Sequence, residues 1–126
     1  MDDLKKNRIA WQNAYIAADT EKLQYMETED FSVTVGGKTI LRKERFQRMR
    51  GANFSDRWSS RSTRFVDYDL MLERRSGSLV VINANSAVFE GDKLIGRIQA
   101  VEIWVLVDGN WKVQSLAYDS LPENEW

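Results

Sequence analysis

The chain has 126 residues, 43% hydrophobic and 29% charged, with one proline and seven glycines, so we expect a single globular domain over residues 1–126. It contains no cysteine and no histidine, which excludes disulfides, thiolate chemistry and imidazole general bases. Any acid–base chemistry must therefore use Asp, Glu, Lys, Tyr or water, and a net charge of −1 argues against a dedicated nucleic-acid-binding protein.

The first 50 residues mix helical and strand patterns. Apolar residues recur at spacings of three, four and seven over residues 3–18, which predicts a helix, and Asp19 or Thr20 can cap a second, shorter helix through Met26. Alternation over 31–35, the turn Gly36-Gly37 and residues 38–41 predict a hairpin, and 42–50 a third helix. The apolar face of the first helix comprises Leu4, Ile9, Trp11, Ala14, Tyr15, Ile16 and Ala18.

The remainder of the chain, after a predicted loop over residues 51–57, has the pattern of long strands. We expect strands over 62–74, 78–89, 94–107 and 111–118, the last two joined at Asp108-Gly109, a strong hairpin signal. Helices followed by a meander indicate an α+β fold, in which about three helices from the N-terminal half pack on the concave face of a curved, cone-like antiparallel sheet.

The strand from Val101 to Val107 is apolar on both faces. An antiparallel sheet normally exposes one face to water, so the outer face of this sheet needs a cover of its own. Homodimerisation through the outer sheet face is the simplest explanation.

Three segments, residues 11–23, 29–38 and 101–113, resemble SnoaL-like members of the nuclear transport factor 2-like superfamily, which are related to ketosteroid isomerases. The order of the predicted elements extends this resemblance over nearly the whole chain. It implies a cone closed by helices, with a cavity open at one end. Members include isomerases, polyketide cyclases, dehydratases, epoxide hydrolases and non-catalytic domains, so the fold does not decide the function.

The resemblance carries over few catalytic residues. The position of the isomerase oxyanion tyrosine falls on Trp11, and that of the carboxylate base at or beside Val35, which is chemically inert. Where many relatives have histidine in the last strand, this chain has Ser115 and Ala117. The family's acid–base residues are thus mostly absent, and the sequence leaves open whether the protein is an enzyme.

The candidate site residues each have two interpretations. Glu102 lies in the most apolar strand, and facing the cavity it would be a general acid or base, whereas facing outward it would be an ordinary surface carboxylate. Asp67 and Asp69 share a strand parity, so as a pair they could do acid–base work or hold a divalent cation, but a solvated surface pair is favoured because acidic side chains are mostly exposed. The aromatic candidates could line a pocket or fill the core, and the two amides could bind a ligand or face solvent. The expected pocket comprises Trp11, Tyr15, Trp58, Asn83, Asn85, Trp104 and Tyr118.

Binding of a small, mostly apolar molecule in the cone, with little or no catalysis, is the leading functional hypothesis. The alternatives are an isomerase, cyclase or hydrolase that uses Glu102, and a protein-interaction module that acts through the outer sheet. The sequence predicts no cofactor and no metal site. The N-terminus MDDLKKNRIAWQ lacks the apolar run of a secretory signal and no segment reaches the length of a membrane span, so we expect a cytoplasmic protein without a membrane partner.

Overall fold

The computed structural model describes residues 2–50 and 63–126. Trp58 and the expected loop over 51–57 lie outside this part of the chain. The helices are α1 (Asp2–Ile16), α2 (Thr20–Met26) and α3 (Arg42–Met49), with a short 3-10 turn at Glu123–Glu125. The strands are β1 (Glu27–Val35), β2 (Lys38–Leu41), β3 (Thr63–Ser76), β4 (Leu79–Glu90), β5 (Lys93–Val107) and β6 (Asn110–Ser120).

Local sequence signals account for the boundaries of the helices and hairpins. The helix α1 ends at Ile16, two residues earlier than predicted, because Ala18 adopts the left-handed conformation with φ of 52°. Asp19 then caps α2 by accepting a hydrogen bond from the backbone N–H of Lys22. Asp108 and Gly109 both have positive φ, 50° and 81°, as a two-residue type I′ hairpin turn requires, and they join β5 to β6 as predicted.

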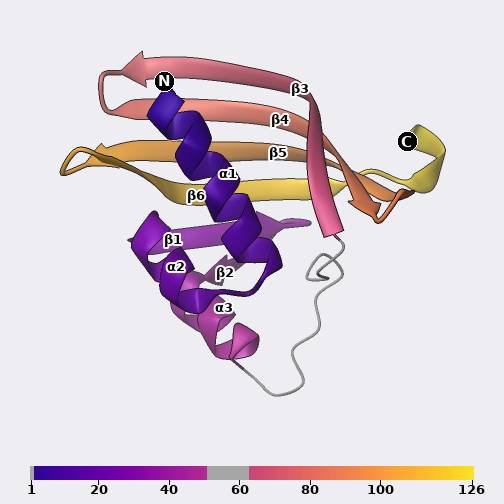
Figure 1. The fold of residues 1–126 in the computed structure, drawn as a ribbon, viewed down its shortest axis with the longest axis horizontal. Helices are drawn as coiled ribbons and strands as arrows, with labels where there is room; N and C mark the ends of the chain where they lie inside the picture. The colour runs from indigo at the N-terminus through magenta and orange to yellow at the C-terminus, as the bar shows by residue number, and fades with distance from the viewer. Residues whose placement is uncertain (1, 51–62) are drawn as a thin grey trace.

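All six strands form one sheet in the order β2-β1-β6-β5-β4-β3 (Figure 1). Four of the neighbouring pairs are antiparallel, as expected, but β1 and β6 run parallel, so the sheet is mixed. The β1–β2 hairpin joins the edge of the β3–β6 meander at β6. Its strand β1 lies beside β6, and the two run in the same direction.

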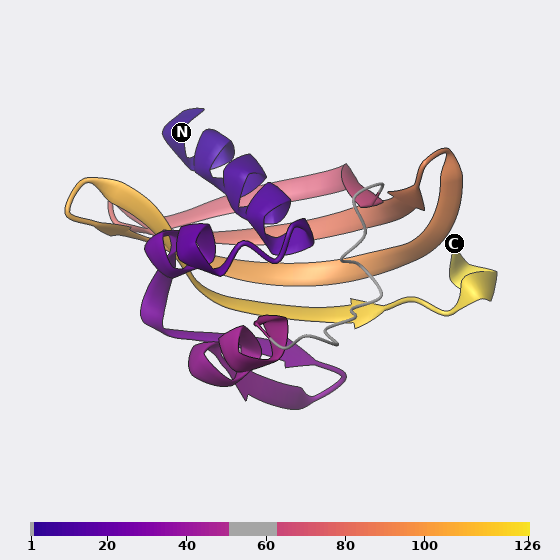
Figure 2. The same ribbon diagram turned by 60° about the horizontal axis from the view of Figure 1, so that its bottom comes forward.

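The helices cover one face of the curved sheet, and α1 crosses the strands diagonally (Figure 2). Between the two layers lies an apolar core in which Trp11 on α1 meets Trp104 on β5 edge to face, with ring centroids 5.7 Å apart. Phe31 on β1 and Leu23 on α2 are fully buried beside them. The expected α+β architecture, with helices on the concave face of the sheet, is confirmed.

The buried face of α1 differs from the prediction at one position. Ile9, expected to widen the apolar face, is 58% exposed, whereas Arg8 is only 5% exposed. Arg8 lies one turn from both Leu4 and Trp11, so it points at the sheet and has to find partners there. Within the described part of the chain, no helix is long and apolar enough to cross a membrane.

Candidate functional site

A small cavity of about 50 Å³ lies between α1 and the inner face of the sheet. Its wall on the helix is formed by successive turns of α1, and its floor by residues of β3 to β6 that point inward. Most of the wall is apolar, and the polar groups gather around Arg8. The lining residues are Arg8, Trp11, Gln12, Tyr15, Phe65, Ser86, Ile98, Ala100, Glu102, Leu116 and Tyr118.

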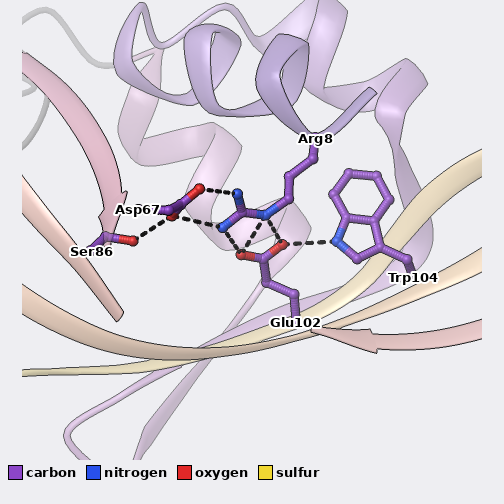
Figure 3. A network of polar contacts seen from close by, with 5 residues as sticks. All are labelled: Arg8, Asp67, Ser86, Glu102 and Trp104. Carbon is purple, nitrogen blue, oxygen red and sulfur yellow. Dashed lines mark hydrogen bonds and ion pairs between the residues drawn. The ribbon is translucent and has the colours of Figure 1, made fainter. Parts of the chain in front are cut away.

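Arg8 is held at the cavity by two carboxylates (Figure 3). Its Nε and Nη2 donate to Oε1 and Oε2 of Glu102 at 2.9 and 2.8 Å, and its Nη1 donates to Oδ2 of Asp67 at 2.7 Å. Burial alone would lower the pKa of Arg8, but hydrogen bonds and attraction from Glu102 and Asp67 outweigh it and raise the pKa above its ordinary value. The guanidinium therefore stays charged.

Asp67 reaches this network because β3 is irregular. The pairing of β3 with β4 shifts register between Asp67 and Asp69, so Asp67 pairs with Ser86 on the inner face and Asp69 pairs with Asn85 on the outer face. The sequence parity had placed both aspartates on one face, and this was wrong because a bulge inserts one residue between them. One carboxylate is thereby recruited to the site.

Glu102 is only 2% exposed and its oxygens are already engaged. Besides the bidentate contact with Arg8, its Oε1 accepts a hydrogen bond from the indole N–H of Trp104 at 2.8 Å. Such an arrangement leaves few lone pairs of the side chain free to contact a substrate. The position is therefore better suited to shaping the cavity than to acid–base work.

A second buried network lies behind Trp11. The indole N–H of Trp11 donates to Oε2 of Glu27 at 2.9 Å, and Oε1 of Glu27 forms an ion pair with Arg45. Burial raises the pKa of Glu27, and the opposing effects of Arg45 and Trp11 do not cancel it. The Arg45 guanidinium carbon lies 4.7 Å from the ring centroid of Phe31 and 5.3 Å from that of Tyr15. This network supports the aromatic wall of the cavity from behind.

The structure brings together some of the predicted site residues and separates others. Trp11, Tyr15, Glu102 and Tyr118 line the cavity. Trp104 is fully buried beneath Glu102 and does not line it, because its indole fills the core between the layers. Trp58 belongs to the part of the chain that the structure does not describe.

Asn83 and Asn85 are placed on the opposite side of the sheet from the cavity. Their neighbours in sequence, Ala84 and Ser86, face inward, so alternation turns both amides outward. There they line a shallow trough of about 560 Å³ that crosses the outer face as far as Gly36 and Asp119. The expectation that the two amides project into the cone is corrected by the parity of β4.

Several lining residues were missed by sequence reasoning. Arg8, Ser86 and Ala100 carry no motif, and their place depends on which face of each strand turns inward. One signal was available for Arg8, since its spacing from Leu4 and Trp11 puts a charged residue on the apolar face of a helix. Among residues 2–50 and 63–126, no group of three or more Asp and Glu side chains could hold a metal ion.

Comparisons with known proteins bear on the fold alone. No family model matches the sequence, and no curated protein matches it. Among solved structures, a Nostoc punctiforme protein of unknown function with a cystatin-like fold has a TM-score of 0.77 at 10% identity, over 96% of this chain and 90% of its own. An NTF2-like (nuclear transport factor 2-like) protein from Cytophaga hutchinsonii has a TM-score of 0.66 at 19% identity, over 94% and 93%.

A third structure, an NTF2-like protein of unknown function from Silicibacter pomeroyi, has a TM-score of 0.67 at 14% identity and covers 95% of this chain and 94% of its own. Identities this low establish shared architecture and leave activity open. The helices on the inner face, the six-stranded mixed sheet and these likenesses agree. The chain has the nuclear transport factor 2-like, or cystatin-like, α+β fold.

Proposed function

We propose that this protein binds a small, mostly apolar molecule in the cavity beneath α1 and that it does so without catalysis. The supporting observation is that an aromatic and aliphatic wall surrounds polar groups already committed to one another. Trp11, Tyr15 and Phe65 offer apolar surface, while Arg8 and Glu102 satisfy each other. A cavity of about 50 Å³ suits a compact molecule or one slender end of a larger molecule.

Native mass spectrometry of the freshly purified protein tests this function. We expect an additional mass from a bound small molecule that is released on denaturation. Replacement Ala100→Leu should remove that mass, because the added side chain fills the cavity, at a cost of about 1–3 kcal/mol in stability. Ala17→Leu is the matched control, because Ala17 is exposed just beyond α1. Equal retention of the ligand by both variants would argue against the cavity as the site.

An isomerase, cyclase or hydrolase that depends on Glu102 is the competing function. The isosteric replacement Glu102→Gln separates the two, because it removes the proton-accepting charge and keeps the shape of the side chain. A binding protein should leave its ligand chemically unchanged both in the wild type and in this variant. A reaction on the co-purified ligand that this replacement abolishes would instead establish the enzyme.

We also propose that the outer face of the sheet pairs with a second copy of this chain. The centre of that face is uncharged, and Val101 is 42% exposed there, with Val81, Ile103 and Val105 partly exposed beside it. Depletion of charge around apolar side chains is typical of the core of a protein interface. Sedimentation at micromolar concentration should report a dimer, and Val101→Asp should yield a monomer. A wild-type monomer would refute the pairing.

A further inference from the structure

At the polar end of the cavity, existing hydrogen bonds decide whether Arg8, Ser86 and Glu102 can donate to a ligand or accept from it. Ser86, 2% exposed, donates its hydroxyl hydrogen to Oδ1 of Asp67 at 2.7 Å. Arg8 directs its Nε, Nη1 and Nη2 to the carboxylates of Glu102 and Asp67 (Figure 3). The third group, Glu102, is a carboxylate and can only accept.

A ligand atom at this end therefore meets mainly acceptors, since the one donor that these three groups have beyond these bonds is the second Nη1 hydrogen of Arg8. A hydroxyl has one hydrogen, so the Ser86 Oγ that donates to Asp67 presents only lone pairs to the cavity. The indole N–H groups of Trp11 and Trp104 are also committed, to Glu27 and Glu102. Gln12, one turn beyond Arg8, has an amide that can present either its oxygen or its NH₂ group.

The net charge of this cluster also favours a ligand that donates hydrogen bonds. The cluster contains one guanidinium, Arg8, against two carboxylates, Glu102 and Asp67, which gives a formal charge of −1. The neighbouring pair of Arg45 and Glu27 contributes one charge of each sign. Aromatic faces line the same cavity, and they attract cations. A buried site with excess negative charge and aromatic walls favours a positively charged donor over a neutral or anionic group.

We propose that the ligand of this cavity is a primary amine, bound as the ammonium, whose charged head donates to Ser86 beside the carboxylates of Asp67 and Glu102 and whose short apolar body contacts Trp11 and Tyr15. The proposal rests on the binding function proposed above and adds the chemical class of the ligand. By volume, the cavity accommodates about three to four water-sized groups. An ammonium with a few methylene groups fits that space, and a longer body extends through the opening.

The test compares three probes of matched shape, butylammonium, 1-butanol and butyrate, at neutral pH, where an alkylamine is protonated as the lysine side chain is. Binding is followed by NMR titration of the Trp11 indole N–H. The Trp126 indole N–H, bonded to the carbonyl of Leu121, serves as the internal reference. We expect butylammonium to bind about tenfold more tightly than 1-butanol, the order of a charge-assisted hydrogen bond, and butyrate not to bind.

Two variants test whether Asp67 and Ser86 cause the preference for butylammonium. Asp67→Asn makes the cluster neutral and lets the new amide donate to Ser86, so the preference for butylammonium over 1-butanol should fall from about tenfold to near unity. The matched control Asp69→Asn makes the same change of charge on the outer face and should leave the preference intact. Ser86→Ala keeps the charges but removes the acceptor, and should weaken butylammonium and 1-butanol severalfold.

Each outcome separates the ligand class from the binding function. If 1-butanol shifts the Trp11 signal as readily as butylammonium, the cavity binds small molecules but the amine class is overturned. If butyrate binds best, the charge argument is overturned. If none of the three probes shifts the Trp11 signal relative to that of Trp126, the binding function itself is refuted.

Discussion

Two buried charge clusters hold α1 against the sheet, and they differ in what surrounds them. The cluster of Arg8, Glu102 and Asp67 lies at the cavity, with every charged group hydrogen-bonded. The cluster of Arg45 and Glu27 lies behind Trp11, and among the described residues Nε and Nη1 of Arg45 have no hydrogen-bond partner, since they lie among aromatic rings. Similar chemistry thus lines a cavity in one place and supports an aromatic wall in the other.

The largest expected effect is a loss of unfolding free energy when the cluster at the cavity loses its guanidinium. Replacement Arg8→Met leaves Glu102 buried without its counter-charge and should lower the free energy of unfolding by about 3–5 kcal/mol. The double variant Arg8→Met/Glu102→Leu should recover most of that loss, because it removes the stranded charge. Urea unfolding measures both. A double variant as unstable as the single one would show that Arg8 acts mainly through packing.

The corresponding change in the second cluster should cost less. Replacement Arg45→Met also strands a carboxylate, but the raised pKa of Glu27 lets that group take up a proton. We expect a loss of about 1–3 kcal/mol, the range for a buried polar group left unsatisfied. The same urea titration tests this order, and a loss larger than that of Arg8→Met would reverse the comparison.

A pH series on Glu27 sharpens the comparison further. Because folding raises the pKa of this carboxyl, its favourable contribution is complete below its ordinary pKa of 4.5 and is lost as pH rises through the raised pKa. The stability of wild type relative to Glu27→Gln should therefore fall as pH rises above the ordinary pKa of 4.5, by about 1.4 kcal/mol for each unit by which the pKa is raised. A difference that grows with pH would show that Arg45 outweighs burial.

The smallest effect is expected at an exposed ion pair. Glu44 and Arg48 lie one turn apart on α3, 3.1 Å from each other, with about half of each side chain exposed. Replacement Glu44→Gln should change the unfolding free energy by about 0.5 kcal/mol or less, because water screens the pair. Thermal unfolding of both proteins provides the measurement, and a loss as large as that of Arg45→Met would contradict the role assigned to burial.

The local elements could be predicted from the sequence because their signals are local. Asp19 caps α2, Asp108-Gly109 turns β5 into β6, and alternation in β1 distinguishes strand from helix. The site could be predicted only in part. Trp11 and Tyr15 follow from helical spacing, but Asn83 and Asn85 were assigned to the wrong face, because the inward face of a strand depends on its partners.

The fold class, the helix caps and the hairpin turns followed from residues close together in the sequence, where backbone propensity and periodicity suffice. The polar end of the cavity was decided by the tertiary structure. Arg8 and Glu102 are 94 residues apart, and Asp67 joins them only because a bulge in β3 turns it inward. Burial makes such long-range ionic contacts compulsory, since a charge withdrawn from water has to be compensated, but the choice of partner depends on how the layers pack.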